Sequence, residues 1–204
     1  MVSFRCFHGT SYQNGMSILA ENHFRSSDSD ALRMGVGAYF FCQAGTNDAY
    51  PIMCARELER YHYTNGKHTD GYAILSCTVE CDEDKFFDLY DPNVLEYFHQ
   101  MRYLLLNKSL KERPGFKYKN GAVADTQVFD VIRKLQHVGV IRCPQYFGMF
   151  EEESKFVFER GEKQFPKTFV PNVIMVCVDT NWAKIKDIEL IQSEVYKNEH
   201  SGIV

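Results

Sequence analysis

Apolar and polar residues alternate in short runs along this chain, and the runs predict a mixture of strands and helices. A period of two residues or a short uninterrupted apolar run is typical of a strand, whereas a period of three to four residues is typical of a helix. Strands are predicted at SFRCFH (3–8), AYFFC (38–42), GYAILSCTVEC (71–81), VGVIRC (138–143), NVIMVCVD (172–179) and AKIKDIELIQ (183–192), the last as an edge strand. A further strand is predicted within FEEESKFVFER (150–160), after an acidic run.

Helices are predicted between these strands, at QNGMSILAENHF (13–24), DAYPIMCARELERY (48–61), NVLEYFHQMRYLLL (93–106) and DTQVFDVIRKLQHV (125–138). Asn47 or Thr46 would cap the second of these helices, and Asp125 would cap the fourth. Pro51 then falls in the first turn of the second helix, where proline is tolerated because its missing N–H has no intrahelical partner there. Polar and glycine-containing segments predict loops at SSDSDALRMGVG (26–37) and GFKYKNGAV (115–123).

Strands and helices are intermixed without the regular strand–helix–strand rhythm of a parallel sheet. This order favours an α+β fold over a doubly wound α/β fold. With 204 residues, the chain is expected to form a single domain over residues 1–204. Apolar residues make up 45% of the chain and aromatic residues 14%, which is ample material for a core.

The formal net charge of -4, from 23 basic and 27 acidic residues, gives no global case for binding nucleic acid. The segment KSLKERPGFKYKN (108–120) is a local exception, in which basic residues are interleaved with Phe116 and Tyr118. Such a segment either tracks a nucleic-acid backbone or is an ordinary solvated loop. The N-terminus lacks the apolar core of a signal peptide, and no apolar run approaches the ~18 residues of a membrane span, so a cytoplasmic protein is expected.

The chain contains seven cysteines, an odd number, and most of them lie inside apolar runs. This placement predicts buried free thiols in a reducing compartment rather than a disulfide framework. Cys77 and Cys81 form a C-x3-C pair without a second cysteine pair or a suitably spaced histidine pair nearby. No metal site is therefore predicted.

Two glycine-containing motifs carry the candidate chemistry. The first, His8-Gly9-Thr10, follows an apolar run; its glycine permits close approach of a ligand, and its histidine offers a ring nitrogen for a hydrogen bond. The second, residues 35–39, places Tyr39 beside two glycines, where its ring can stack on a flat heterocycle. This Gly-x-Gly precedes a strand and lacks the third glycine, so it is not a dinucleotide-binding fingerprint. Taken alone, each motif also fits an ordinary turn beside a strand.

Together, the two motifs resemble those of the ADP-ribosyltransferase superfamily, in its poly(ADP-ribose)-polymerase-like, or diphtheria-toxin-like, branch. In that branch the first core strand ends in His-Gly-(Thr/Ser) and a later strand reads Gly-x-Tyr-Phe, matched here by residues 8–10 and 37–40. A second tyrosine often follows the first by eleven residues, and Tyr50 stands at that position. Residues 173–192 are similar to the last two strands of the family. The resemblance covers roughly half of the chain, leaves residues 82–135 unplaced and implies a split β-sheet core with flanking helices.

The resemblance implies that NAD is the substrate and that the two motifs line one cleft. His8 would donate a hydrogen bond to the 2′-hydroxyl of the adenosine-side ribose. Gly9 would hold the nicotinamide carboxamide through its backbone, with Thr10 beside it in the binding motif. Tyr39 and Tyr50 would sandwich the nicotinamide ring.

The chain departs from the family at a third position. The penultimate strand of the polymerising members begins with a glutamate, whereas the matching residue here is Ile174, or Met175 if the register shifts by one. Members that transfer a single ADP-ribose frequently carry an apolar residue there, so single transfer is expected. A carboxylate from the preceding acidic segment, Glu153 or Glu159, would supply a missing catalytic acid, unless that segment is an ordinary solvated loop.

The expected activity is therefore NAD-dependent mono-ADP-ribosylation of a macromolecular acceptor, either a protein or a nucleic acid. A small transferase domain of this type further implies a toxin of a toxin–antitoxin or anti-phage system, with an antitoxin protein as a partner. Two alternatives stay open. One is a catalytically inactive domain that binds ADP-ribose or a partner protein. The other is an RNA 2′-phosphotransferase, which would draw on Arg5, Arg25, Arg33 and Arg142 to bind phosphate.

Overall fold

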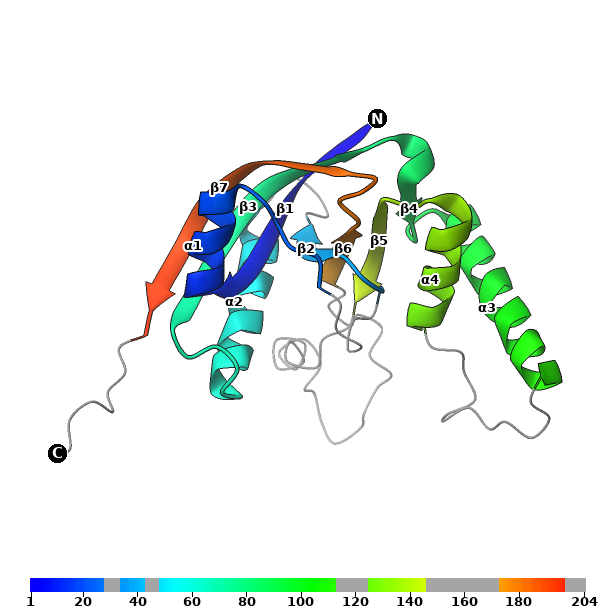
Figure 1. Cartoon of the computed structure of the whole chain (residues 1–204), viewed down its shortest axis with the longest axis horizontal. Coiled ribbons are helices and arrows are strands. Elements are labelled where there is room, and N and C mark those ends of the chain that lie inside the picture. The colour runs from blue at the N-terminus through cyan, green and yellow to red at the C-terminus, as the bar shows by residue number, and fades with distance from the viewer. Residues whose placement is uncertain (28–33, 43–47, 113–124, 146–172, 197–204) are drawn as a thin grey trace, which may run out of the picture.

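A computed structural model describes residues 1–27, 34–42, 48–112, 125–145 and 173–196 of the chain. The described residues form one seven-stranded sheet and four α-helices (Figure 1), which is the α+β mixture predicted. The strands are β1 (Val2–Ser11), β2 (Ala38–Cys42), β3 (Gly71–Cys81), β4 (Phe86–Asp88), β5 (Val140–Gln145), β6 (Val173–Val178) and β7 (Lys184–Val195). The helices are α1 (Tyr12–Glu21), α2 (Ala49–Thr64), α3 (Pro92–Glu112) and α4 (Asp125–Gln136), with a short 3-10 turn, η1, at Glu83–Lys85.

The strands lie in the order β4-β5-β6-β2-β1-β3-β7. All neighbouring strands are antiparallel except β4 and β5, which are parallel. The N-terminal strand β1 therefore sits inside the sheet, and β7 forms one edge, as its alternating sequence predicted. A sheet of this kind is not doubly wound, because it lacks the repeated parallel crossovers of that architecture.

Two apolar cores cover the two faces of the sheet. On one face, α2, α3 and α4 pack on the sheet and form a core that includes Phe41 of β2, Phe98 of α3 and Ile132 of α4. On the other face, α1 and the chain that follows it form a core with the sheet, which includes Phe24 after the helix and Phe40 of β2. Figure 1 shows α1 and α2 on opposite sides of β1, and α3 beside α4 at the β4–β5 end of the sheet.

The pairing of β1 with its two neighbours is unequal, and this difference positions the candidate site. Ten residue pairs join β1 to β3, from Val2↔Cys81 to Ser11↔Tyr72. The ladder between β1 and β2 contains the pairs Cys6↔Cys42 and Phe7↔Phe41 and then stops. Beyond Phe7, β1 continues beside β3 while β2 continues beside β6, so the two strands diverge where the two motifs lie. We call this feature the β1–β2 divergence.

Several element boundaries differ from those predicted. The first strand does not end at His8 but runs to Ser11, because its last residues pair with β3. Asp48 takes the N-cap position of α2 in place of Asn47 or Thr46, and Pro51 falls in the first turn as expected. The short strand β4 was missed, since three residues are too few to show a period. The loop at 115–123 and the strand within 150–160 lie outside the described residues.

The longest helix of the described residues, α3, has 21 residues and mixes polar with apolar side chains. Across the ranges that the structure describes, no helix combines the length and the apolar character needed to span a membrane. The seven cysteines are all free and buried, so the predicted reduced thiols are confirmed.

Candidate functional site

His8 lies near the end of β1, at the start of the β1–β2 divergence. Its Nδ1 is 2.7 Å from the carbonyl oxygen of Tyr39 on β2. Because a carbonyl only accepts, this nitrogen carries the proton, and in the neutral ring Nε2 is an acceptor. Burial lowers the pKa of His8, an effect that the Tyr39 carbonyl and the charge of Glu59 oppose. The ring packs edge-on against Phe24, with centroids 5.2 Å apart.

Helix α2 packs tightly against β1 at Gly9. A Cβ added to Gly9 would lie 2.5 Å from the carbonyl oxygen of Ala55 and 3.0 Å from Cγ of Glu59. The glycine of the motif is thus required by packing of the helix on the strand. Thr10 faces the opposite side of the sheet and is buried beneath α1, close to Gly15.

Tyr39 is anchored through its hydroxyl group. This hydroxyl donates to the carbonyl oxygen of Gly35 at 2.6 Å and accepts from the backbone N–H of Met34 at 3.0 Å. Burial raises the pKa of Tyr39 well above its usual value. Beside it, Arg133 of α4 donates to Sγ of Cys177 at 2.9 Å and to the carbonyl oxygen of Val36. The phenol is therefore neutral, with its hydroxyl tied to the segment that precedes β2.

The imidazole of His8 and the ring of Tyr39 point to opposite faces of the sheet. Side chains alternate along a strand, and directly paired residues share a face. His8 therefore lies on the same face of the sheet as Cys6 and Phe40. Its ring contacts the ring of Phe40, with 5.6 Å between the two centroids. Tyr39 packs against the core on the other face, under α2 and α4. The two motifs thus meet through the ring nitrogen of His8 and the backbone carbonyl of Tyr39. The rings of these two residues do not face each other.

Tyr50 lies in the first turn of α2, and 39% of its surface is exposed. Since α2 packs on the face that carries Tyr39, both tyrosines belong to the same side of the sheet. The N-terminus of α2 is tied to β1 by an ion pair of 3.4 Å between Arg5 and Asp48.

Ile174 lies near the start of β6, paired with Pro144 of β5. It packs into the core that includes Phe40, on the same face as His8. Tyr39 pairs with Cys177, three residues further along β6, which places Ile174 about 10 Å along the strand from that row. Met175 points to the opposite face and is buried in the core beneath α2 and α4.

Other sequence candidates fall outside the described residues. Glu153 and Glu159, the proposed catalytic acids, lie in the segment 146–172. The basic and aromatic segment 108–120 is described only to residue 112, within the last turn of α3.

A cluster that sequence reasoning missed lies beside Gly9. Glu59 is 2% exposed, and its two carboxylate oxygens contact Nδ1 of His62 at 3.2 Å and Nδ1 of His68 at 2.5 Å. Burial would raise the pKa of Glu59, but the hydrogen bonds and charges of the two histidines outweigh it and lower the pKa. The spacing Glu-x-x-His at residues 59–62 was the signal that would have pointed to this cluster.

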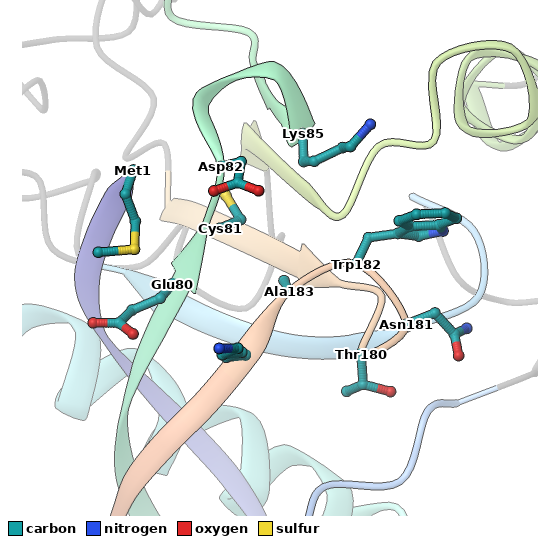
Figure 2. A pocket seen from close by; sticks show the side chains of 10 residues that line it. Met1, Glu80, Cys81, Asp82, Lys85, Thr180, Asn181, Trp182 and Ala183 are labelled. Carbon is teal, nitrogen blue, oxygen red and sulfur yellow. The ribbon is translucent and has the colours of Figure 1, made fainter.

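A cavity of about 470 Å³ lies at another place, between the ends of β3 and β7 and the connection from β6 to β7. Figure 2 shows Met1 and Glu80 on one side of it and Lys85 with Trp182 on the other. Nζ of Lys85 stands 5.5 Å from the centre of the Trp182 ring. None of His8, Gly9, Tyr39 and Tyr50 lines this cavity.

Comparison with protein-family models, curated proteins and solved structures found no match to this chain.

Proposed function

We propose that this chain uses NAD as a substrate and transfers one ADP-ribose unit to a macromolecular acceptor. The observation that supports this most is the β1–β2 divergence, which opens where the sequence carries His8-Gly9-Thr10 on one strand and Gly37-Ala38-Tyr39-Phe40 on the other. Past Phe7, the side of β1 that faces β2 is no longer part of their shared ladder. A flat amide such as nicotinamide can hydrogen-bond to backbone groups where two strands diverge.

The two faces of the sheet suggest how the dinucleotide lies. Nicotinamide would bind where β1 and β2 diverge, between the rings of Tyr39 and Tyr50, with backbone groups of Gly9 rather than its helix-covered α2 side holding the carboxamide. The adenosine ribose would reach His8 on the α1 side. Because Nδ1–H of His8 donates to the Tyr39 carbonyl, Nε2 would accept a hydrogen bond from the ribose hydroxyl rather than donate one.

The reaction breaks the bond between C1′ of the ribose and the ring nitrogen of nicotinamide. The bonding electrons return to the nitrogen, which leaves as neutral nicotinamide, and the ribose passes through an oxocarbenium-like state. A nucleophile of the acceptor then bonds to C1′, and its proton passes to a basic group of the acceptor or to solvent. The protein contributes mainly by holding both reactants in line.

Ile174 supports single transfer over chain growth. Elongation requires that a ribose hydroxyl be oriented and deprotonated, and an aliphatic side chain packed into the core does neither. A glutamate from the segment 146–172, Glu153 or Glu159, is proposed as the carboxylate of the first transfer, where its negative charge would stabilise the oxocarbenium-like ribose. A role as a toxin, held by an antitoxin protein, is proposed with the same activity.

The phosphotransferase alternative is less well supported. It needs several arginines gathered around one phosphate, whereas three of the four candidates each pair with a carboxylate at a different place. The pairs are Arg5 with Asp48 at 3.4 Å, Arg25 with Glu21 at 2.9 Å, and Arg142 with Asp88. Arg33 lies outside the described residues.

Incubation of the purified chain with labelled NAD and bacterial extract tests the proposal. We expect label to become fixed to protein or nucleic acid, which protease and nuclease digestion will distinguish, and each acceptor to carry one unit by mass spectrometry. His8→Ala should abolish labelling, whereas His99→Ala, at an exposed position on α3, should not.

The outcomes separate the alternatives. NAD binding without any turnover would support an inactive ADP-ribose-binding domain, and NAD consumption that requires a 2′-phosphorylated RNA would support the phosphotransferase. A ladder of ADP-ribose units would contradict single transfer. Growth arrest on expression that His8→Ala relieves would support the toxin role, and normal growth in spite of active enzyme would contradict it.

A further inference from the structure

We propose that Glu59, His62 and His68 form a binding site for one zinc ion. Each of these side chains offers one donor atom, and the three donor atoms all lie within 4.8 Å of one another. Two imidazole nitrogens and one carboxylate oxygen form a donor set that zinc takes in proteins, with water as the fourth ligand. Zinc binding by these three residues does not require NAD or the proposed transfer reaction.

The local sequence explains how three separate residues converge. Glu59 and His62 are three residues apart on α2 and therefore share one helix face. The chain then reverses after the helix, where Gly66 adopts a φ of 69° and the N–H of Lys67 donates to the carbonyl oxygen of His62 at 2.9 Å. This reversal returns His68 to the same face of α2, before β3 begins at Gly71.

The burial of Glu59 gives the site its energetic rationale. Its side chain is 1% exposed, while those of His62 and His68 are 24% and 25% exposed. A carboxylate removed from water must be neutralised by a nearby positive charge. A divalent cation meets this need, and the imidazole ring binds metal in its uncharged form.

The donors are close enough together for one small transition-metal ion to contact all three, once it replaces the hydrogen bonds between Glu59 and the two histidines. Zinc–nitrogen and zinc–oxygen bonds of about 2.0–2.2 Å place neighbouring donors of a tetrahedral site about 3.3 Å apart. The carboxylate oxygens lie 3.2 Å from His62 and 2.5 Å from His68, and the two imidazole rings are 4.8 Å apart at an angle of 73°. Calcium and magnesium are excluded by the chemistry of the donors, since both prefer oxygen ligands throughout.

The position of the site predicts what the metal does. Cγ of Glu59 is 3.0 Å from the place where Gly9 would carry a Cβ. Zinc would therefore fasten α2 to the connection that leads into β3, directly over the end of β1. Its removal should loosen this junction and lower the melting temperature of the whole domain.

The test uses the purified 204-residue chain and zinc alone. We expect one zinc per chain by elemental analysis after titration and dialysis, and a rise in melting temperature with zinc that EDTA reverses. His62→Gln and His68→Gln should each weaken zinc binding by more than about 100-fold, a loss greater than that from outer-shell partners. His99→Gln, on the exposed surface of α3, is the matched control and should bind zinc as the wild type does.

Cobalt(II) titration of the wild type keeps the test decisive if a variant does not fold. Cobalt at this site should give the visible absorption of a tetrahedral ion without the near-ultraviolet band of a thiolate ligand, which any of the seven cysteines would produce. A wild-type chain that takes up no zinc, a thiolate band with cobalt, or zinc affinity unchanged in both histidine variants would each overturn the proposal.

Discussion

Gly9 lies where helix α2 packs tightly against strand β1. The carbonyl oxygen of Ala55 lies 2.5 Å from the position of an added Cβ, a separation that real Cβ atoms do not reach. Backbone atoms of a packed helix do not yield as a flexible side chain does. The residue that the sequence presents as part of a ligand motif is therefore first a packing requirement, and the approach of α2 in turn brings Glu59 beside Gly9.

We predict that Gly9→Ala destabilises the fold by about 1–3 kcal/mol, the range for overpacking a tight site. Gly9→Val should be worse than Gly9→Ala, since the clash grows with volume. Urea unfolding followed by circular dichroism measures both variants. Equal stability of wild type and Gly9→Ala would show that α2 does not pack against β1 as closely as described.

His8 should make stability depend on pH. In the folded state, burial lowers the pKa of His8 below its ordinary value of 6.5, and His68 adds a smaller lowering. The Tyr39 carbonyl and Glu59 oppose this change but do not outweigh it. Well above pH 6.5 the ring is neutral in both states and has no effect. As the pH falls below this value, the unfolded chain binds a proton that the folded chain does not, so stability decreases until the folded pKa is reached.

The decrease due to His8 has an upper limit of about 1.4 kcal/mol per pH unit. His8→Gln keeps a donor for the Tyr39 carbonyl but does not titrate. The difference in free energy of unfolding between wild type and His8→Gln, measured from pH 7.5 to pH 5 at roughly half-unit steps, isolates this contribution from the other histidines. A constant difference across this range would show that His8 titrates alike in both states.

At the scale of the elements, Tyr39 connects β2 to the segment that precedes it. Its hydroxyl donates to Gly35 and accepts from the N–H of Met34, whose side chain is fully buried. The ring supplies the proposed stacking face, while the hydroxyl fixes where β2 begins. These two functions of one side chain can be separated by substitution.

We predict that Tyr39→Phe lowers the free energy of unfolding by about 1–3 kcal/mol, because it leaves the Met34 N–H without its partner. The same change should leave NAD affinity nearly intact, since the ring remains. Tyr39→Ala should remove both the hydrogen bonds and the stack, and weaken NAD binding by a further ~1–3 kcal/mol. Calorimetric titration with NAD, paired with urea unfolding, measures the two effects. Equal losses of NAD affinity in both variants would assign binding to the hydroxyl.

The strength of the local pattern decided which elements could be predicted. AYFFC and GYAILSCTVEC coincide with β2 and β3, because long apolar or alternating runs leave few alternatives. The end of β1 was wrong because His8 to Ser11 are held by pairing with a strand more than sixty residues away. Local sequence carries no information about such a partner. The three residues of β4 are fixed in the same way, by β5.

The candidate site was predictable only in part for a similar reason. The motifs indicated that His8 and Tyr39 would be neighbours, and Nδ1 of His8 does contact the Tyr39 carbonyl. That their rings face opposite sides depends on the pairing register of β1 and β2, which a one-residue shift would reverse. The cluster of Glu59, His62 and His68 was not predicted. His68 joins Glu59 through a turn centred on Gly66, so spacing along the helix would have pointed only to Glu59 and His62.

At the scale of the whole molecule, the two cores share one sheet, and the cysteines are divided between them. Cys6, Cys42 and Cys77 lie on three adjacent strands, in the core beneath α1. Cys54, Cys143 and Cys177 lie in the core beneath the other helices. Because reaction requires a thiolate that is exposed to reagent, thiols placed in this way report the integrity of both cores at once.

We predict that none of the seven thiols reacts within minutes with Ellman's reagent in the native state at about pH 8, near the ordinary thiol pKa. Burial raises the pKa of Cys77 to about 12, and burial together with nearby acidic groups raises that of Cys81 to about 11, so even these groups are protonated there. All seven should react once denaturant unfolds the chain. Ser17→Cys, at an exposed position on α1, is the positive control and should react at once with one equivalent. Rapid labelling of a native wild-type thiol would show that one core opens without global unfolding, and peptide mapping of the labelled cysteine would identify which core it is.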